Sequence, residues 1–317
     1  MMQIPSCTIG KAVKVTVNPA LYNGAGTVKK VEDVKEAARC EAAGAILVGS
    51  ITVLERTGNA GNVLWVGPHG SLNSLGIPNG GIPYYRQHLP EMVQIAHDAG
   101  KPFFVSVAGF KPEEFGQLAE VAAEGGADGV ELNFGCPNIW DSAEQKGIFS
   151  FYPEMINEAL DNVWSRINYS LIWMVKASPF SNPMQLKEVA KAISSWSINA
   201  IVTSNTFPNA YGVDRATGLP LITPGGGLAG FAGQGFKNIA LGQVKQWREA
   251  LPPSIGVIGV GGISSGEDMA EYFHSGKVIA VQAVSTLLRK NRLDLHDLGR
   301  LLREFIELPE QEPETAA

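Results

Sequence analysis

Charged side chains are scarce in this 317-residue chain: they make up 18% of it, whereas about a quarter is usual in soluble proteins. A disordered chain needs high charge and few apolar residues, and 45% of these residues are hydrophobic. Long apolar runs are also missing: none reaches the roughly 18 residues of a membrane-spanning helix, and the first residues lack the apolar core of a signal peptide. The sequence therefore predicts a cytoplasmic protein with a large core and no membrane partner.

Cysteine and clustered positive charge are also rare. The three cysteines are widely spaced and form no CxxC, which excludes a disulfide framework and a zinc site of that type. No two of the five histidines are spaced as a metal-binding pair, so we expect no metal. The net charge is −6 with no cluster of Lys and Arg, and this argues against nucleic acid as a partner.

Short apolar runs alternate with amphipathic segments along most of the chain. Several of these segments begin with Ser, Asn or Pro and end at Gly, as helices do. Eight alternating units predict an α/β fold, a single (β/α)8 TIM barrel, with a doubly wound open sheet as the alternative. No break in composition indicates a second domain, so we expect one barrel over residues 1–308 and a polar tail over 309–317. The predicted strands are 13–17, 45–48, 102–107, 129–133, 171–176, 200–204, 256–260 and 278–284.

Barrels place their active sites at the carboxyl ends of the strands. These ends carry glycines, amides, one lysine and one cysteine, but no pair of carboxylates, which argues against a glycosidase. After the seventh strand, Gly261 and Gly262 precede a predicted helix, and Ser285 and Thr286 follow the eighth strand. Backbone amides there can cradle a phosphate; alternatively, the two glycines only permit a tight turn.

The segment ELNFGCPN, residues 131–138, places Cys136 on a loop shaped by glycine and proline. Such a polar setting suits an acid–base or nucleophilic cysteine, whereas Cys7 and Cys40 are expected to be small buried hydrophobes. Lys176, at the end of the fifth strand, is either a solvated charge or a fixed cation inside the site. Asparagines at four strand ends suit a flat neutral ligand with alternating N–H and C=O groups, although each alone is typical of a turn.

Together, these motifs resemble the dihydroorotate dehydrogenase family of FMN-dependent (β/α)8 barrels. The matching motifs occur in the family's order: GAGT (24–27), RTGN, GSLNSLGIPN, ELNFGCPN, VKASP, SNTF, GGLAG (226–230) and IGVGGISSGED. Cysteine at position 136 resembles the soluble class 1 enzymes, since the membrane-associated class 2 uses serine. SNTF and VDRATGLP are more similar to the NAD-linked branch of class 1 than to its fumarate-using branch.

The resemblance implies oxidation of dihydroorotate to orotate in pyrimidine biosynthesis, a reaction at a CH–CH bond. Cys136 would be the general base while hydride passes to flavin N5, under a lid formed by residues 137–152. The implied partners are a second copy in a homodimer and an electron-transfer subunit that carries FAD and an iron–sulfur cluster. The implied substrate-binding residues are Asn73, Asn133, Asn138, Asn205 and Thr206. The implied FMN-binding residues are Ala25, Ser50, Asn133, Lys176, Ser204, Gly227, Gly261, Gly262 and Ser285.

The chain departs from the family at Gly49. The family usually has a lysine directly after the second strand, where it contacts both the flavin and the carboxylate of the substrate. Loss of this charge opens a second hypothesis, in which a related dehydrogenase or ene-reductase acts on an uncharged lactam, imide or enone. A third hypothesis is a non-catalytic FMN-binding partner subunit.

Overall fold

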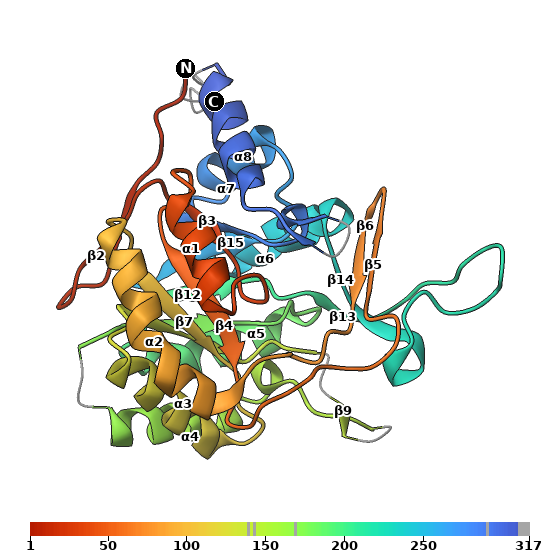
Figure 1. Ribbon diagram of the computed structural model, residues 1–317, viewed down its shortest axis with the longest axis horizontal. Coiled ribbons are helices and arrows are strands. Elements are labelled where there is room, and N and C mark those ends of the chain that lie inside the picture. The colour runs from red at the N-terminus through yellow and green to blue at the C-terminus, as the bar shows by residue number, and fades with distance from the viewer. Residues whose placement is uncertain (138–139, 142–143, 168–169, 290–291, 310–317) are drawn as a thin grey trace.

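The computed structural model describes residues 1–137, 140–141, 144–167, 170–289 and 292–309. Its centre is an eight-stranded parallel sheet (Figure 1). Along the sheet the strand order is β3-β16-β15-β12-β11-β8-β7-β4, so that neighbouring strands are consecutive βα units. The strands are β3 (Leu21–Asn23), β4 (Ile46–Ile51), β7 (Phe103–Val107), β8 (Gly129–Asn133), β11 (Ile172–Lys176), β12 (Ala200–Thr203), β15 (Gly256–Val260) and β16 (Ala280–Ala283).

The two end strands, β3 and β4, are joined through a buried asparagine. The Asn23 side chain donates to the Leu47 carbonyl at 2.7 Å and accepts from the Leu47 amide at 3.1 Å. The Gly44 amide donates to the Leu21 carbonyl at 2.8 Å. These bonds complete the ring, so the sheet is a barrel and the predicted (β/α)8 fold is confirmed.

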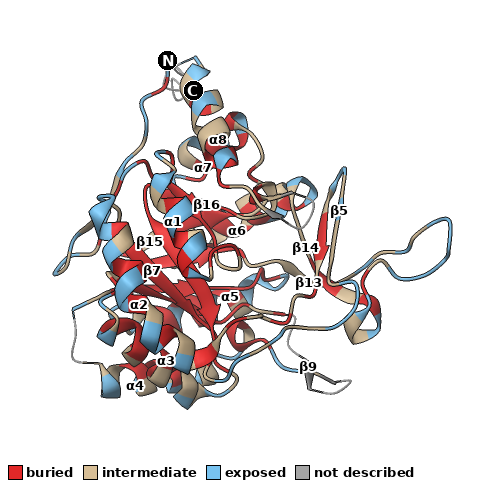
Figure 2. Cartoon of the chain, viewed as in Figure 1, coloured by how far each residue is buried: buried red, intermediate tan, exposed pale blue. Residues whose placement is uncertain are grey.

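One helix follows each barrel strand. Pro begins α3, α4 and α5, and α7 begins with a capping box in which Ser265 and Asp268 bond each other's backbone amides. The strands are almost wholly buried, whereas the helices expose their outer faces (Figure 2). The helices are α1 (Val31–Arg39), α2 (Gly81–Asp98), α3 (Pro112–Glu124), α4 (Pro153–Arg166), α5 (Pro183–Ser194), α6 (Lys237–Ala250), α7 (Gly266–His274) and α8 (His296–Glu307).

The prediction for the first barrel strand was wrong. Residues 13–17 contribute β2 (Val15–Val17), which pairs antiparallel with β1 (Cys7–Ile9) outside the barrel sheet. Ile9 and Val17 nevertheless pack into the same buried cluster as Tyr22 of β3. The apolar character of residues 13–17 therefore reflects contact with the end of the barrel, whereas the true strand, Leu-Tyr-Asn, is short and carries polar atoms.

A second sheet, which the sequence did not predict, lies beside the carboxyl ends of the barrel strands (Figure 1). Its order is β13-β14-β6-β5, so it joins an insertion after β4 to one after β12. Its strands are β5 (Leu64–Gly67), β6 (Gly70–Asn73), β13 (Phe207–Tyr211) and β14 (Leu228–Ala232).

The remaining elements are short. They are the two-residue strands β9 (Trp140–Asp141), β10 (Glu144–Gln145), β17 (Leu288–Arg289) and β18 (Arg292–Leu293), and the 3-10 turns at Phe149–Phe151, Pro224–Gly227, Gln234–Phe236 and Ser285–Leu287. Within the described parts of the chain, no helix combines the length and the apolarity needed to cross a membrane. Most of the predicted tail, residues 310–317, lies outside the described residues.

The Asn23 closure yields a stability prediction. Asn23→Ala leaves the buried amide and carbonyl of Leu47 without their partner, and an unsatisfied buried group costs about 1–3 kcal/mol. We expect the free energy of unfolding in urea to fall by about 2–4 kcal/mol. Asn162→Ala is the matched control, because the Asn162 side chain bonds only the exposed carbonyl of Glu158 in its own helix. Equal, small losses in both variants would show that Asn23 does not close the barrel.

Candidate active site

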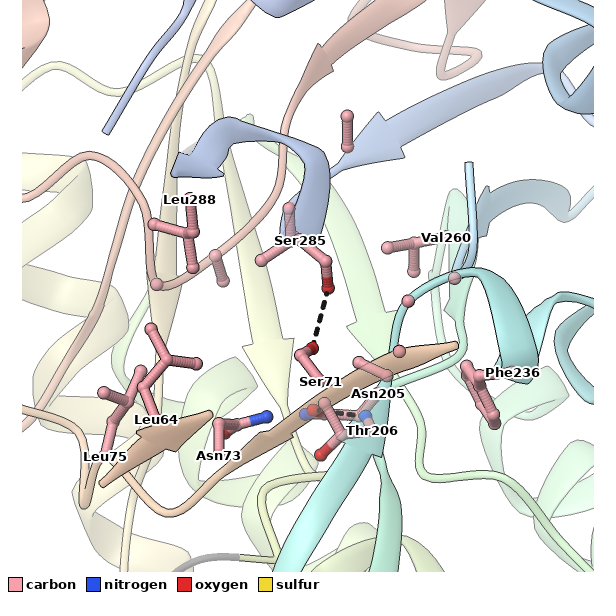
Figure 3. Close-up of a pocket in the computed structure, with 18 of the residues that line it drawn as sticks. Leu64, Ser71, Asn73, Leu75, Asn205, Thr206, Phe236, Val260, Ser285 and Leu288 are labelled. Atoms are coloured by element: carbon pink, nitrogen blue, oxygen red, sulfur yellow. Dashed lines mark hydrogen bonds between the residues drawn. The ribbon is translucent and has the colours of Figure 1, made fainter. Parts of the chain in front are cut away.

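A cavity opens at the carboxyl ends of the barrel strands, where the second sheet covers them. In Figure 3, Ser71 on β6 and Ser285 beyond β16 point toward each other across it, with 3.4 Å between their hydroxyl oxygens. Asn73, Asn205 and Thr206 lie together in the same view. Among the described residues that line the cavity, the charged ones are two lysines, Lys29 and Lys176, and none is a carboxylate. The cavity thus favours anionic or neutral ligands.

A chain of side-chain hydrogen bonds leads from the cavity into the barrel. The Asn205 amide donates to Asn133 Oδ1 at 2.9 Å, and Asn133 Nδ2 donates to Ser50 Oγ at 2.9 Å. Ser106 donates its single hydroxyl proton to Glu131 at 3.0 Å, so Ser50 must be the donor in the 2.9 Å contact between the two serines. Every donor in the chain therefore points toward the Glu131 carboxylate, and this direction fixes which way the Asn133 amide faces.

Glu131 on β8 is fully buried, and it is bonded by Gln282 from across the barrel and faces the Lys176 cation of the neighbouring strand β11. Gln282 Nε2 donates to Glu131 Oε2 at 2.8 Å, and Lys176 Nζ lies 3.8 Å from Oε1. Lys176 also donates to Gln282 Oε1 at 3.3 Å. Among the described residues, no other acceptor is in hydrogen-bond range of the Lys176 ammonium, so donors remain for a ligand in the cavity.

The predicted general base and the described residues predicted to bind the substrate all line this cavity. Cys136 is half-buried and lines it with Asn73, Asn133, Asn205 and Thr206. The Thr206 hydroxyl is buried and has no hydrogen-bond partner within the described residues. A buried hydroxyl in that state calls for a partner such as a ligand or water. Asn138, predicted beside Cys136, lies outside the described residues.

The glycines after β15 have both of the roles considered for them. They line the cavity, and they allow close packing: a Cβ on Gly262 would lie 2.6–2.8 Å from atoms of Lys237, two of them backbone atoms. Beyond Ile263, the amides of Ser264 and Ser265 already donate to the Asp268 carboxylate at 2.8 and 3.0 Å. A phosphate would therefore meet Gly261 and Gly262 with Ser285 and Thr286, rather than the first turn of α7.

Gly227 is the one described site residue that the structure places elsewhere. A Cβ on it would meet Tyr211 and Pro220, and it does not line the cavity. The residues that follow it form β14, so the glycine that reaches the cavity is Gly233, one residue beyond that strand. Ala25, Ser50, Lys176, Ser204 and the remaining predicted FMN-binding residues all line the cavity.

Several cavity residues were not predicted from sequence. Gln282 is a buried residue of β16, in which the other residues are apolar. A single amide in an apolar strand is the feature of the sequence that could have indicated its role. Ser71 and Gly233 reach the site only through the second sheet. Lys29 lies in the first loop, where a lysine before a helix resembles an ordinary solvated residue.

Gly49 has a conformation that explains the absence of a side chain. Its φ is +114°, and a Cβ would lie 2.4 Å from the Ser106 carbonyl oxygen. A lysine therefore does not fit on this backbone without moving β7.

The other two cysteines lie apart from the cavity. Burial raises the pKa of Cys7 to about 11, and Cys40 donates to the Leu295 carbonyl at 3.4 Å. In the portion of the chain that is described, no three His, Cys, Asp or Glu side chains are grouped to hold a metal.

Comparisons with known proteins agree with this geometry. The family model for dihydroorotate dehydrogenase matches residues 10–304. A dihydroorotate dehydrogenase (fumarate) from Saccharomyces bayanus is 30% identical over 267 residues, covering 84% of this chain and 82% of the relative. A probable dihydroorotate dehydrogenase A (fumarate) from Streptococcus pneumoniae is 27% identical, covering 87% and 86%. The crystal structure of an Eimeria tenella DHODH in complex with ferulenol has the same fold, with a TM-score of 0.74 at 16% identity over 92% of this chain and 81% of that one.

The buried Glu131–Lys176 pair yields a second prediction. Lys176→Met leaves the Glu131 carboxylate buried without its cation, and removal of one partner from such a pair costs about 3–5 kcal/mol. Adding Glu131→Gln removes the stranded charge, so we expect the double variant to recover more than half of the lost free energy of unfolding. Urea unfolding of the ligand-free chains measures both. A double variant no more stable than Lys176→Met would contradict this account of the pair.

Proposed function

Because the chain belongs to the dihydroorotate dehydrogenase family, we propose that it oxidises dihydroorotate to orotate. The family consists of flavin-dependent oxidoreductases that act on CH–CH bonds. The observation that supports the proposal best is the position of Cys136, which shares one cavity with three asparagines and with the Thr206 hydroxyl, which has no partner among the described residues. This set matches a ring with alternating N–H and C=O groups next to a carbon that loses a proton.

We propose FMN as the flavin. The described residues fit it: the Gly261 and Gly262 backbone, with Ser285 and Thr286, would hold the phosphate, and none of the described lining residues is acidic and would repel it. Ala25, Ser50, Asn133, Lys176 and Ser204 would hold the ring system, with Gly233 in place of Gly227. When bound, FMN would supply the hydride acceptor.

The chain's own residues would orient the substrate and take its proton. Asn73, Asn133, Asn205 and Thr206 would hold the pyrimidine ring, together with Asn138, which is predicted from sequence and lies outside the described residues. Cys136 would act as the general base toward the carbon next to a carbonyl, at a position inside the cavity. The loop 137–152 would cover the substrate and exclude water.

The uncharged-substrate hypothesis keeps one observation in its favour, which is Gly49. Without a lysine at that position, a neutral lactam, imide or enone is the alternative ligand for the same cysteine and amides.

The proposed reaction is tested by anaerobic mixing of the flavin-loaded protein with dihydroorotate. We expect rapid loss of the yellow flavin absorbance, because substrate oxidation reduces the ring. Cys136→Ala should slow this loss by ~10²–10⁴-fold, the usual contribution of a positioned base, with flavin content unchanged. The matched control is Cys40→Ala, since Cys40 does not line the cavity and should leave the rate unchanged.

Two outcomes would count against the proposal. A parent protein that dihydroorotate fails to reduce, but a neutral lactam or imide does reduce, supports the uncharged-substrate hypothesis. Equal rates in the parent and in Cys136→Ala would assign the proton transfer to another group.

We propose fumarate as the electron acceptor, although the SNTF and VDRATGLP motifs suggested the NAD-linked branch. Both relatives described above carry fumarate in their names, and these names are the ground for the proposal. A homodimer in the cytoplasm, without an FAD-carrying subunit, is the arrangement that fits this proposal.

The acceptor is tested after the flavin has been reduced. We expect fumarate to restore the yellow absorbance of the isolated protein, while NAD alone leaves the flavin reduced. A flavin that fumarate leaves reduced would instead favour the NAD-linked branch, in which electrons reach NAD only through the FAD-carrying subunit. Sedimentation of the same sample tests the dimer.

A further inference from the structure

The first loop places a second cation at the cavity, next to the position that lacks a lysine. Lys29 lines the cavity, and the residue before it, Val28, forms a parallel bridge with Val48 of β4. The Gly49 amide donates to the Val28 carbonyl at 3.0 Å, and the Gly26 amide donates to the Gly49 carbonyl at 2.6 Å. Both the amide and the carbonyl of Gly49 are therefore bonded to residues 26–28, and Lys29 is the next residue after this segment.

The position of Lys29 is fixed by its own backbone. Its amide donates to the Asp33 carboxylate at 2.9 Å, and its carbonyl accepts from the Tyr85 hydroxyl at 3.2 Å. The Asp33 carboxylate is bonded to the Lys29 and Lys30 amides at the start of α1. Throughout the described residues, no carboxylate lies within ion-pair distance of the Lys29 ammonium, so its charge is available to a ligand.

The two cavity lysines differ in what already neutralises them. Lys176 is paired with Glu131 at 3.8 Å, whereas Lys29 has no such partner among the residues described. Lys29 is also at the β3–β4 side of the cavity, while the residues suited to a phosphate follow β15 and β16. Residues 75–78, which follow Asn73, also line the cavity. They lie near the end of β4, on the same side as Lys29, because the Asn79 side chain accepts from the Thr52 amide at 3.1 Å.

We propose that the Lys29 ammonium binds the carboxylate of the substrate, and that it supplies from the first loop the charge that is missing at position 49. The inference rests on the proposed function, since it takes dihydroorotate and orotate as the ligands. It makes Lys29 a specificity-determining residue, which separates carboxylated from uncharged pyrimidine rings.

The protonation of Lys29 fits this role near neutral pH. Burial lowers its pKa to about 8, and the Asp33 carboxylate opposes that shift. Among the described residues, the Tyr85 hydroxyl of α2 donates to the Lys29 carbonyl, and Lys176 lines the same cavity. Lys29 is therefore a cation at pH 7 and loses its proton as the pH rises through about 8, so its affinity for an anion should fall over that range.

The test measures orotate binding from the change in flavin absorbance, which needs no turnover. We expect Lys29→Met to weaken orotate binding ~10- to 100-fold, the effect of losing one charge-assisted hydrogen bond, with flavin content retained. Binding of uracil, which lacks the carboxylate, should stay unchanged. Lys30→Met is the matched control, since Lys30 is the exposed neighbour and does not line the cavity.

A charge-conserving variant adds a pH readout. In the parent, orotate affinity should fall between pH 7 and pH 9, and Lys29→Arg should bind orotate without that fall because arginine stays protonated. If Lys29→Met does not fold, Lys29→Gln and this pH comparison test the same charge.

Each other outcome separates the two proposals. Unchanged orotate affinity in flavin-loaded Lys29→Met would overturn the role of Lys29 and leave the proposed reaction standing. Loss of flavin from that variant would also overturn it, because Lys29 would then serve the cofactor. Failure of dihydroorotate to reduce the parent would defeat the proposed reaction, and failure of the parent to bind orotate would defeat the role of Lys29 as well.

Discussion

The site depends on one buried charge, the Glu131 carboxylate inside the barrel. A carboxylate without solvent exposure is costly unless it is paired and hydrogen-bonded, and here both oxygens accept hydrogen bonds while Lys176 lies nearby. The carboxylate orders what surrounds it. Because it can only accept, Ser106, Ser50 and Asn133 all donate in its direction, and the cavity receives an asparagine whose orientation is already set. The buried carboxylate inside the barrel thus sets the orientation of the polar side chains at the cavity.

Neutralisation of that charge also decides the electrostatics of the cavity. Lys176 reaches the cavity with its charge largely balanced by Glu131, and amides and hydroxyls supply most of the remaining polar lining. Of the described cavity residues, Lys29 is the cation without an ion-pair partner, and it lies at one side. A flat polar ring with an anionic group on one edge is the ligand that such a distribution favours, and orotate has this form.

Much of the fold could be predicted because parallel strands buried on both faces are continuous apolar runs, as in β7, β11 and β15. The same criterion failed for β3, where Tyr22 and Asn23 are buried polar residues whose partners are distant in sequence. The cysteine and the described asparagines could be placed at the cavity because they lie at strand ends. The position of Gly227 away from the cavity and the second sheet could not be predicted, since pairing between β6 and β14 joins segments more than 150 residues apart and leaves no local pattern.

Gly49 shows why the residue at a single position of the sequence does not decide whether the cavity holds a cation. The family's lysine belongs to one strand end, and its absence suggests a site without a cation for the substrate. In space, however, the ends of neighbouring strands converge, and the Gly49 backbone is bonded on both sides to the segment that leads into Lys29. In the role proposed for Lys29, the positive charge comes from a neighbouring loop of the same cavity. The close approach of Gly49 to the Ser106 carbonyl explains why position 49 cannot supply it, because this backbone has no room for a lysine side chain.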